Sequence, residues 1–248
     1  MALPQIAAAC RRLISVRFIY MEHRSVALDG PAAAGKSTMA RRAAGRFGLI
    51  YVDTGALYRA VGLYALRNNA GPKDEQAVAR LLPEIKLDMR YDENGMQRMY
   101  LGDEDVTDEI RKPQISAYAS DVSALAPVRA FLLETQREMA RKHDVIMDGR
   151  DIGTVVLPDA GLKVFMTAQP AARAARRYLE LIGKGIETTP EEVMREMEQR
   201  DKNDSERALA PLKAADGALI LDTTEMGPDE SFESLCAFIS NMMISGVR

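Results

Sequence analysis

The sequence GPAAAGKS, residues 30–37, constrains the fold more than any other part of this 248-residue chain. It follows SVALD, an apolar run typical of a buried strand, and it leads into STMARRAAGRF, which has the pattern of a helix. Gly30 and Gly35 allow a tight turn whose backbone N–H groups face an anion, and the N-terminus of the following helix adds partial positive charge. This order of strand, loop and helix predicts a phosphate-binding loop (P-loop) within an α/β sheet.

The motif also assigns roles to the residues of the loop. Lys36 is placed to reach the β and γ phosphates of a nucleoside triphosphate, and the Ser37 hydroxyl is placed to bind Mg²⁺, partly through water. The predicted nucleotide-binding residues are Gly30, Pro31, Ala32, Ala33, Ala34, Gly35, Lys36, Ser37 and Thr38. Because a P-loop specifies nucleotide binding and leaves the reaction open, the second substrate must be inferred from other residues.

Five short apolar runs predict the strands of one parallel sheet, each followed by turn or capping residues. They lie at 25–30, 49–55, 145–151, 162–168 and 218–224. Helical patterns between them predict an α/β fold of the P-loop NTPase type, with a five-stranded parallel sheet flanked by helices. Three of the strands end in an aspartate, and we expect all three carboxylates at the ligand-binding edge: Asp29, Asp53 and Asp148.

Two stretches interrupt this core pattern. Residues 85–107 alternate apolar and polar side chains around Asn94 and Gly95, which predicts a small antiparallel insertion. The charged stretch at 173–207 has glycines between helical patterns and predicts two mobile helices. We therefore expect one domain over residues 25–248, with an acceptor-binding insertion at about 55–135 and a helical lid at about 170–210.

Composition excludes several classes of protein. A formal net charge of -3 and 47% hydrophobic residues do not fit a nucleic-acid coat or a membrane-surface protein. Only Cys10 and Cys236 are present, outside any CxxC pattern, so we expect no disulfide framework, no zinc site and a cytoplasmic location. The arginine-rich residues 1–24 fit either a targeting leader or, since Met21 stands just ahead of the first strand, an upstream start or loose tail, which we favour.

Charged side chains follow the second predicted strand. The sequence DTGALYR places Thr54 and Arg59 near a helix start, where they could face one cleft only if the helix begins after Gly55. Arginine can bind a phosphate through two parallel hydrogen bonds. As an alternative, Asp53 is a helix cap.

A second charged cluster, DGRD, follows the third strand. Arg150 is expected to bind a phosphate, and Asp148 and Asp151 to accept hydrogen bonds from an amine or to hold Mg²⁺ through water. As an alternative, Arg150 is a plain ion-pair partner.

Four motifs in order, GPAAAGKS, DTGALYR, DGRDIGTVVLPDA and RDKNDSERALAPL, resemble the bacterial cytidylate kinase family. The resemblance runs from about residue 25 to 237, which is nearly all of the chain except the leader. It implies transfer of the γ-phosphate of ATP to CMP or dCMP, with Mg²⁺, in pyrimidine nucleotide metabolism. It implies no nucleic-acid or membrane partner, and we expect a monomer. The choice between CMP and dCMP is left open.

The resemblance also implies roles for single residues. Arg59, Arg150 and Arg207 correspond to clamps on the acceptor phosphate. Thr54 and Asp151 correspond to acceptors for the cytosine amino group, a donor that uracil lacks. Many members of the family have Ser at position 54, and both residues offer a hydroxyl. The complete set of implied substrate-binding residues is Thr54, Arg59, Ser120, Arg129, Asp148, Arg150, Asp151, Arg200, Asp204 and Arg207, of which Ser120, Arg200 and Asp204 correspond to ribose contacts and Arg129, with Arg207, to donors toward the base.

Arginines of the predicted lid complete the implied machinery. Arg173, Arg176 and Arg177 are spaced to share one helix face, and they resemble lid arginines that close over the transferred phosphate. As an alternative, they form a solvated basic face. The implied catalytic set is Lys36, Arg150, Arg173, Arg177 and Arg207. Since the acceptor phosphate is anionic near neutral pH, we expect no general base.

Three rival functions are weighed against this one. Another small-molecule kinase, acting on UMP, AMP or shikimate, would share the P-loop. A regulatory GTPase would usually carry NKxD after a late strand, whereas the late strand here ends in ALILDTT. A non-catalytic ATP-dependent interaction module does not account for Lys36, Ser37 and the paired arginine clusters.

Overall fold

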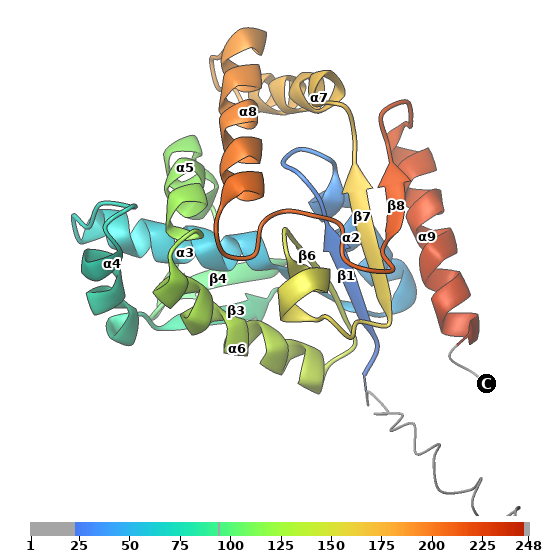
Figure 1. Cartoon of the computed structure of the whole chain (residues 1–248), viewed down its shortest axis with the longest axis horizontal. Helices are drawn as coiled ribbons and strands as arrows, with labels where there is room; N and C mark the ends of the chain where they lie inside the picture. The colour runs from blue at the N-terminus through green and yellow to red at the C-terminus, as the bar shows by residue number, and fades with distance from the viewer. Residues whose placement is uncertain (1–22, 94, 246–248) are drawn as a thin grey trace, which may run out of the picture.

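The structure is a computed structural model that describes residues 23–93 and 95–245. At its centre is a five-stranded parallel sheet of order β2-β6-β1-β7-β8 (Figure 1). All five predicted strands are confirmed. Their bounds are β1 Ser25–Asp29, β2 Ile50–Asp53, β6 Val145–Gly149, β7 Leu162–Thr167 and β8 Leu219–Asp222.

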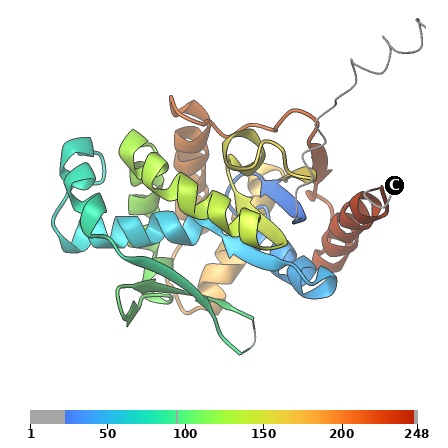
Figure 2. The same ribbon diagram turned by 90° about the horizontal axis from the view of Figure 1, so that it is seen from below.

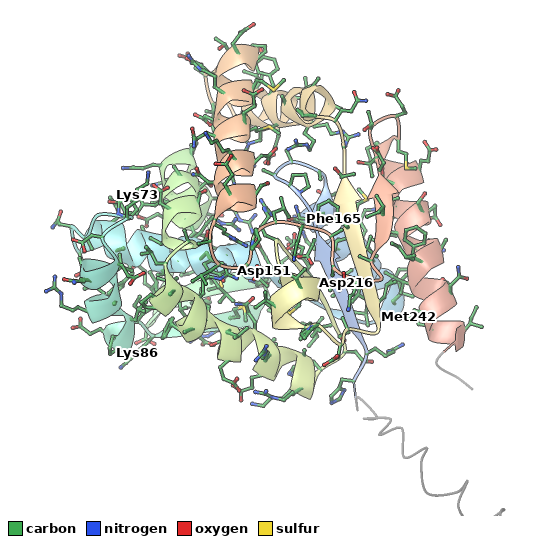
Figure 3. The ribbon with its side chains drawn as sticks, viewed as in Figure 1. Lys73, Lys86, Asp151, Phe165, Asp216 and Met242 are labelled. Carbon is green, nitrogen blue, oxygen red and sulfur yellow. The ribbon has the colours of Figure 1, made fainter. Side chains whose placement is uncertain are left out.

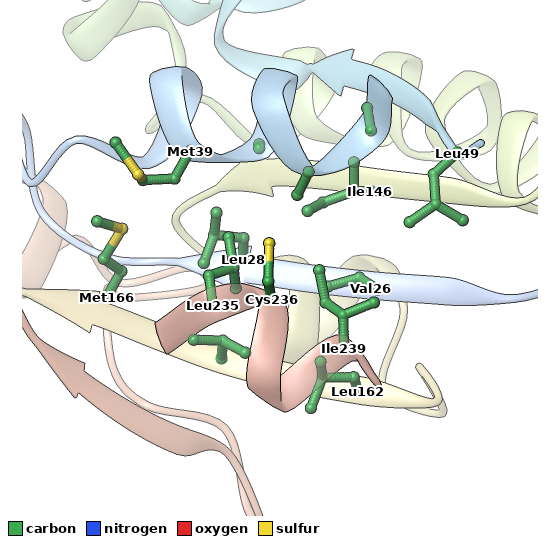
Figure 4. Packing of buried hydrophobic residues seen from close by; sticks show 14 of the residues in the cluster. Val26, Leu28, Met39, Leu49, Ile146, Leu162, Met166, Leu235, Cys236 and Ile239 are labelled. Atoms are coloured by element: carbon green, nitrogen blue, oxygen red, sulfur yellow. The ribbon is translucent and has the colours of Figure 1, made fainter. Parts of the chain in front are cut away.

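The central strands read as apolar runs because helices cover both faces of the sheet. Val26 and Leu28 of β1 pack against α2 (Lys36–Phe47) and α9 (Pro228–Ser245), as Figure 4 shows. Ala27, on the opposite face, belongs to a cluster that includes Ala140 of α6 (Ala126–Lys142). The sheet therefore holds its carboxyl edge rigidly between two helical layers.

The predicted antiparallel insertion lies beside β2 and packs around a second hydrophobic cluster. Hydrogen bonds join its hairpin to β2: Tyr91 Oη donates to the Tyr51 carbonyl at 2.9 Å, the Asp53 N–H donates to Gln97 Oε1 at 2.8 Å, and Gln97 Nε2 donates to the Asp53 carbonyl at 3.5 Å. Figure 2 shows the hairpin as a long two-stranded ribbon beside α3. The elements of this region are α3 Thr54–Arg67, α4 Glu75–Leu81, η1 Leu82–Glu84, β3 Leu87–Tyr91, β4 Gln97–Leu101, β5 Glu104–Asp105, η2 Glu109–Arg111 and α5 Pro113–Val122.

Helices α3 and α5 cross closely at Gly62. A Cβ added there would lie 3.2 Å from the backbone N of Ala119, which cannot move aside as a side chain can. We expect Gly62→Ala to lower the free energy of unfolding by about 1–3 kcal/mol through overpacking. Gly45→Ala is the matched control, since a Cβ on this α2 glycine meets nothing within 4 Å. That variant should gain about 0.5–1 kcal/mol from helix propensity, so urea denaturation should give opposite signs.

Two helices stand beyond the carboxyl edge of the sheet, as predicted for residues 173–207 (Figure 1). They are α7 (Pro170–Gly183) and α8 (Pro190–Glu206). A capping box starts α8: the Glu192 N–H donates to Thr189 Oγ1 at 3.2 Å, and the Thr189 N–H donates back to Glu192 Oε2 at 3.0 Å. The α7–α8 pair has its own small apolar cluster, built from Ala174, Leu181, Val193 and Met197.

The predicted leader falls mostly outside the described residues, which begin at His23. Arg24 is already part of the sheet, because its carbonyl accepts a hydrogen bond from the Val145 N–H at 2.8 Å and its side chain pairs with Asp144 at 2.6 Å. Within residues 23–93 and 95–245, no helix has both the length and the apolar character needed to cross a bilayer.

Candidate active site

The P-loop begins where β1 ends, and its backbone is fixed by two glycines. A Cβ on Gly30 (φ 149°) would lie 1.9 Å from the Met166 carbonyl oxygen, so only glycine fits there. Gly35 (φ 93°) has a left-handed conformation and directly precedes the first residue of α2. The loop therefore presents its N–H groups and the N-terminus of α2 at the carboxyl edge of the sheet.

The two reactive side chains of the loop are buried close together. Lys36 Nζ donates to the Pro31 carbonyl at 2.7 Å, and burial together with the positive charge of Arg150 lowers the pKa of Lys36. Ser37 Oγ donates to Asp148 Oδ2 at 2.5 Å. Burial and the neighbouring Asp53 carboxylate raise the pKa of Asp148. An anion bound beside Lys36 would favour its charged form.

The pair of Ser37 and Asp148 fits a magnesium ion. Both offer the hard oxygen donors that Mg²⁺ prefers, and Mg²⁺ usually takes one or two protein ligands, with water and phosphate oxygens filling the rest of its shell. In the described part of the chain, no group of three or more His, Cys, Asp or Glu side chains could hold a metal ion.

The three strand-end aspartates lie at the carboxyl edge of the sheet, as expected, but their side chains have different partners. Asp148 contacts the P-loop. Asp29 instead accepts the N–H groups of Ile152 and Gly153, each at 2.7 Å. Asp53 accepts the Ala56 N–H at 2.9 Å, so the alternative that it is a helix cap is correct.

Thr54 and Arg59 both lie at the carboxyl edge even though α3 begins at Thr54, not after Gly55 as the spacing argument required. Arg59 reaches back to Asp53 Oδ2 at 2.7 Å. Thr54 Oγ1 donates to the Asp148 carbonyl at 2.7 Å and is buried. That bond uses the hydroxyl hydrogen and leaves the oxygen able to accept a hydrogen bond.

Arg150 and Asp151 follow β6 and join it to distant elements. Arg150 Nε donates to Asp204 Oδ2 of α8 at 2.7 Å, which is the ion pair weighed as the alternative. Asp151 lies near the lower end of α8 (Figure 3) and is bonded by Arg129 of α6 and by Arg207, the latter at 3.4 Å. Segments far apart in sequence therefore meet around one buried carboxylate.

Several buried polar atoms of this cluster have no hydrogen-bond partner in the described structure. They are Nε of Arg59, Nε of Arg200 and Oγ of Ser120. Burial, and next the charge of Arg150, lowers the pKa of Arg200 to about 10. Because buried polar groups are normally satisfied, these three atoms are candidates for hydrogen bonds to a ligand. They belong to the residues that the resemblance assigned to phosphate and ribose.

The arginines of α7 do not share one face toward the cleft. Arg173 is buried and donates to the Ala32 carbonyl of the P-loop at 3.0 Å, to the Ala168 carbonyl at 2.9 Å, and to Asp201 of α8 at 2.7 Å. Arg176 turns toward the loop after β8 and donates to Thr223 Oγ1 at 3.0 Å. Arg177 pairs with Glu180 on its own helix at 2.8 Å. Of the three, only Arg173 bonds to the P-loop.

A protein-family model described as cytidylate kinase matches residues 26–241 of the chain. The chain belongs to the cytidylate kinase family. Among curated relatives, a cytidylate kinase from Lactobacillus johnsonii is 50% identical over 205 residues, covering 83% of this chain and 89% of the relative. Cytidylate kinases from Caldicellulosiruptor bescii and Lactiplantibacillus plantarum are each 44% identical, covering 87% and 90% of this chain and 95% and 97% of theirs.

Sequence reasoning missed three residues that support this cytidylate kinase site. Gln97 of the hairpin holds the end of β2, as described above. The ring of Tyr58 lies 5.9 Å from the Arg129 guanidinium, and Tyr51 Oη lies 3.4 Å from Asp148 Oδ1. The hairpin alternation predicted that one of its faces is buried, but nothing in the sequence pairs Gln97 with Asp53 or either tyrosine with its partner.

Proposed function

We propose that the chain transfers the γ-phosphate of ATP to CMP or dCMP, giving ADP and CDP or dCDP, as a (d)CMP kinase of pyrimidine nucleotide metabolism. One observation carries the proposal beyond family membership. The end of β6 carries Asp148, bonded to P-loop Ser37, and the turn that follows carries Arg150, which is paired with α8. The donor and acceptor pockets are therefore built on one short segment.

The chain's own residues supply positioning and charge in this reaction. Lys36 and the P-loop amides hold the donor phosphates, while Arg59, Arg150 and Arg207 hold the acceptor phosphate, with Arg173 and Arg177 on the α7 side. Ser37 and Asp148 would hold Mg²⁺, which neutralises phosphate charge when bound. Because the attacking phosphate oxygen is already anionic near neutral pH, no side chain has to remove a proton.

Two acceptors distinguish cytosine from uracil in this proposal. Thr54 has a free lone pair once its hydrogen is donated to Asp148, and Asp151 is held in place by Arg129 and Arg207. The cytosine amino group donates to both, whereas the uracil carbonyl would face a carboxylate. The unpartnered Oγ of Ser120 and Nε of Arg200, with the Asp204 carboxylate, would meet the ribose hydroxyls.

An ADP-release assay across CMP, dCMP, UMP, AMP and shikimate tests the proposal. CMP or dCMP should give the highest kcat/KM. Faster turnover with UMP, AMP or shikimate would assign the chain another acceptor, and ATP hydrolysis that no acceptor accelerates would contradict a kinase role. We further propose a monomer acting in the cytoplasm, which sedimentation and cell fractionation would check.

We expect Asp151→Ala to weaken CMP selectively. Removing the carboxylate deletes an acceptor for the cytosine amino group and a repulsive contact for the uracil carbonyl. The ratio of kcat/KM for CMP to that for UMP should fall by about 5- to 150-fold, the range of one good base-discriminating contact. Asp105→Ala, which removes an exposed ion pair with Arg98, should leave the ratio unchanged. An unchanged ratio in Asp151→Ala would remove Asp151 from base recognition.

A further inference from the structure

Asp151 occupies a helix N-cap position, but its side chain does not cap the helix. It directly precedes a short π-helical turn, η3 (Ile152–Val156), so it is the N-cap residue of that turn. An N-cap aspartate usually accepts the backbone N–H of the second or third residue of its own helix. Asp151 makes no such bond, and its carboxylate is instead bonded to Arg129 and Arg207.

The first N–H groups of η3 are satisfied from outside. Asp29 Oδ1 accepts the Ile152 N–H and Asp29 Oδ2 accepts the Gly153 N–H, both at 2.7 Å. Asp29 ends β1 and is only 3% exposed. A carboxylate 123 positions away in sequence thus performs the capping that Asp151 would otherwise perform.

The contact between Asp29 and η3 is tightly packed and charged. A Cβ on Gly153 would lie 3.4 Å from Asp29 Oδ2 and 3.1 Å from Ala215 Cβ, which leaves the turn little room to shift. Burial raises the pKa of Asp29, with a smaller contribution from the Asp151 charge, and the two N–H bonds and the Lys36 charge oppose the shift. Both carboxylate oxygens of Asp29 accept an N–H, as an ionised carboxylate can.

We propose that Asp29 is a positioning residue for base specificity: by capping η3 in place of Asp151, it leaves the Asp151 carboxylate in its bonds to Arg129 and Arg207, which direct it toward the acceptor base. Asp29 is also the residue before Gly30, so the same side chain ties the start of the P-loop to the acceptor turn. The inference rests on the proposed function, since base discrimination is its main readout.

The variant Asp29→Asn tests it. The asparagine side chain has one oxygen that can accept a backbone N–H, and its NH₂ group would face the other N–H of η3 as a second donor. We expect the Asp151 carboxylate to become the better cap and to turn toward η3. The ratio of kcat/KM for CMP to that for UMP should fall by about tenfold, the factor expected for one hydrogen bond to a charged group. The KM for ATP should change by less than about threefold, because Lys36 and the loop amides remain.

Two further variants separate positioning from general damage. Asp222→Asn is the matched control, since Asp222 also ends a strand and accepts the Thr224 N–H at 2.9 Å, and it should keep the wild-type ratio. The double variant of Asp29→Asn and Asp151→Ala should discriminate no better and no worse than Asp151→Ala alone, because both act through one carboxylate. Additive losses would overturn the inference, as would a normal ratio in Asp29→Asn.

Amide hydrogen exchange, measured without an acceptor substrate, tests the role of Asp29 independently of the proposed function. Amide hydrogen exchange at Gly153, the second residue of η3, should stay protected in Asp29→Asn, with Asp151 as the new cap, and lose protection only when Asp151→Ala is added. Loss of protection in Asp29→Asn alone would show that Asp151 does not take over, and would overturn the inference. If wild-type enzyme prefers another acceptor, the proposed function fails while this exchange test still decides which residue caps η3.

If Asp29→Asn does not fold, Gly153→Ala provides a second test, because the added methyl group crowds the same contact with Asp29. This variant should also lower the ratio of kcat/KM for CMP to that for UMP. An unchanged ratio would overturn the inference.

Discussion

Replacing Lys36 by Met should lower kcat by about 10²- to 10³-fold, the usual effect of removing one preorganised donor from a developing charge. The ammonium group is buried and bonded to the Pro31 carbonyl, so it is held at the mouth of the loop before nucleotide arrives. Met has a similar length and no charge, which preserves packing. Stopped-flow or coupled ADP assays with saturating ATP and CMP would measure the loss.

Lys142→Met is the control for this variant. Lys142 lies on the exposed side of α6, where it pairs with Glu138 at 2.6 Å, and its loss should leave kcat within about twofold. A Lys36→Met enzyme that keeps wild-type kcat and has only a raised KM for ATP would limit Lys36 to ground-state binding.

Arg150→Ala should lower kcat/KM for CMP by about 10³-fold, by analogy with arginines that neutralise charge in phosphoryl transfer. Arg150 lies directly after β6, next to Asp151. Asp204 holds its Nε and the Gly149 carbonyl accepts from its Nη1 at 3.2 Å, so Nη2 remains for an acceptor phosphate. The ATP dissociation constant should stay within about threefold, because the P-loop amides and Lys36 are untouched. Steady-state kinetics together with calorimetric ATP titration would separate the two effects.

Loss of Arg150 also leaves the buried Asp204 carboxylate without its ion pair, so thermal unfolding must be followed in parallel. Arg46→Ala, which breaks an exposed pair with Glu233 at 2.8 Å, should alter neither kcat/KM nor ATP binding. If Arg150→Ala and Arg46→Ala have the same kcat/KM for CMP, Arg150 is only an ion-pair partner of Asp204.

The sheet, the hairpin and the two helices after β7 were predictable because each depends on a pattern that repeats along the sequence. Buried strands such as β1 and β6 are continuous apolar runs, and the hairpin alternates around a turn. The α7–α8 pair follows from helical periodicity interrupted by glycines. These patterns indicate which side chains are buried, because burial depends mainly on whether each residue is apolar or polar.

The side-chain partners in the site were less predictable, since they depend on contacts between distant segments. The sequence gives no sign that Asp29 turns toward η3 while Asp148 turns toward Ser37, although both end buried strands. Nor does helical spacing distinguish Arg173, which bonds to the P-loop, from Arg176, which bonds to the loop after β8. In each case the deciding partner lies more than 45 positions away.

The private apolar cluster of α7 and α8 has a mechanical consequence. Ala174, Leu181, Val193 and Met197 pack on one another. We therefore expect α7 and α8 to move as one rigid body in any motion of the lid, with their internal contacts kept. Ala33 of the P-loop packs against this cluster, and its left-handed backbone (φ 56°) holds its methyl group in an uncommon conformation. The Ala33 methyl group and the hydrogen bond from Arg173 to the Ala32 carbonyl therefore connect the α7–α8 pair to the P-loop.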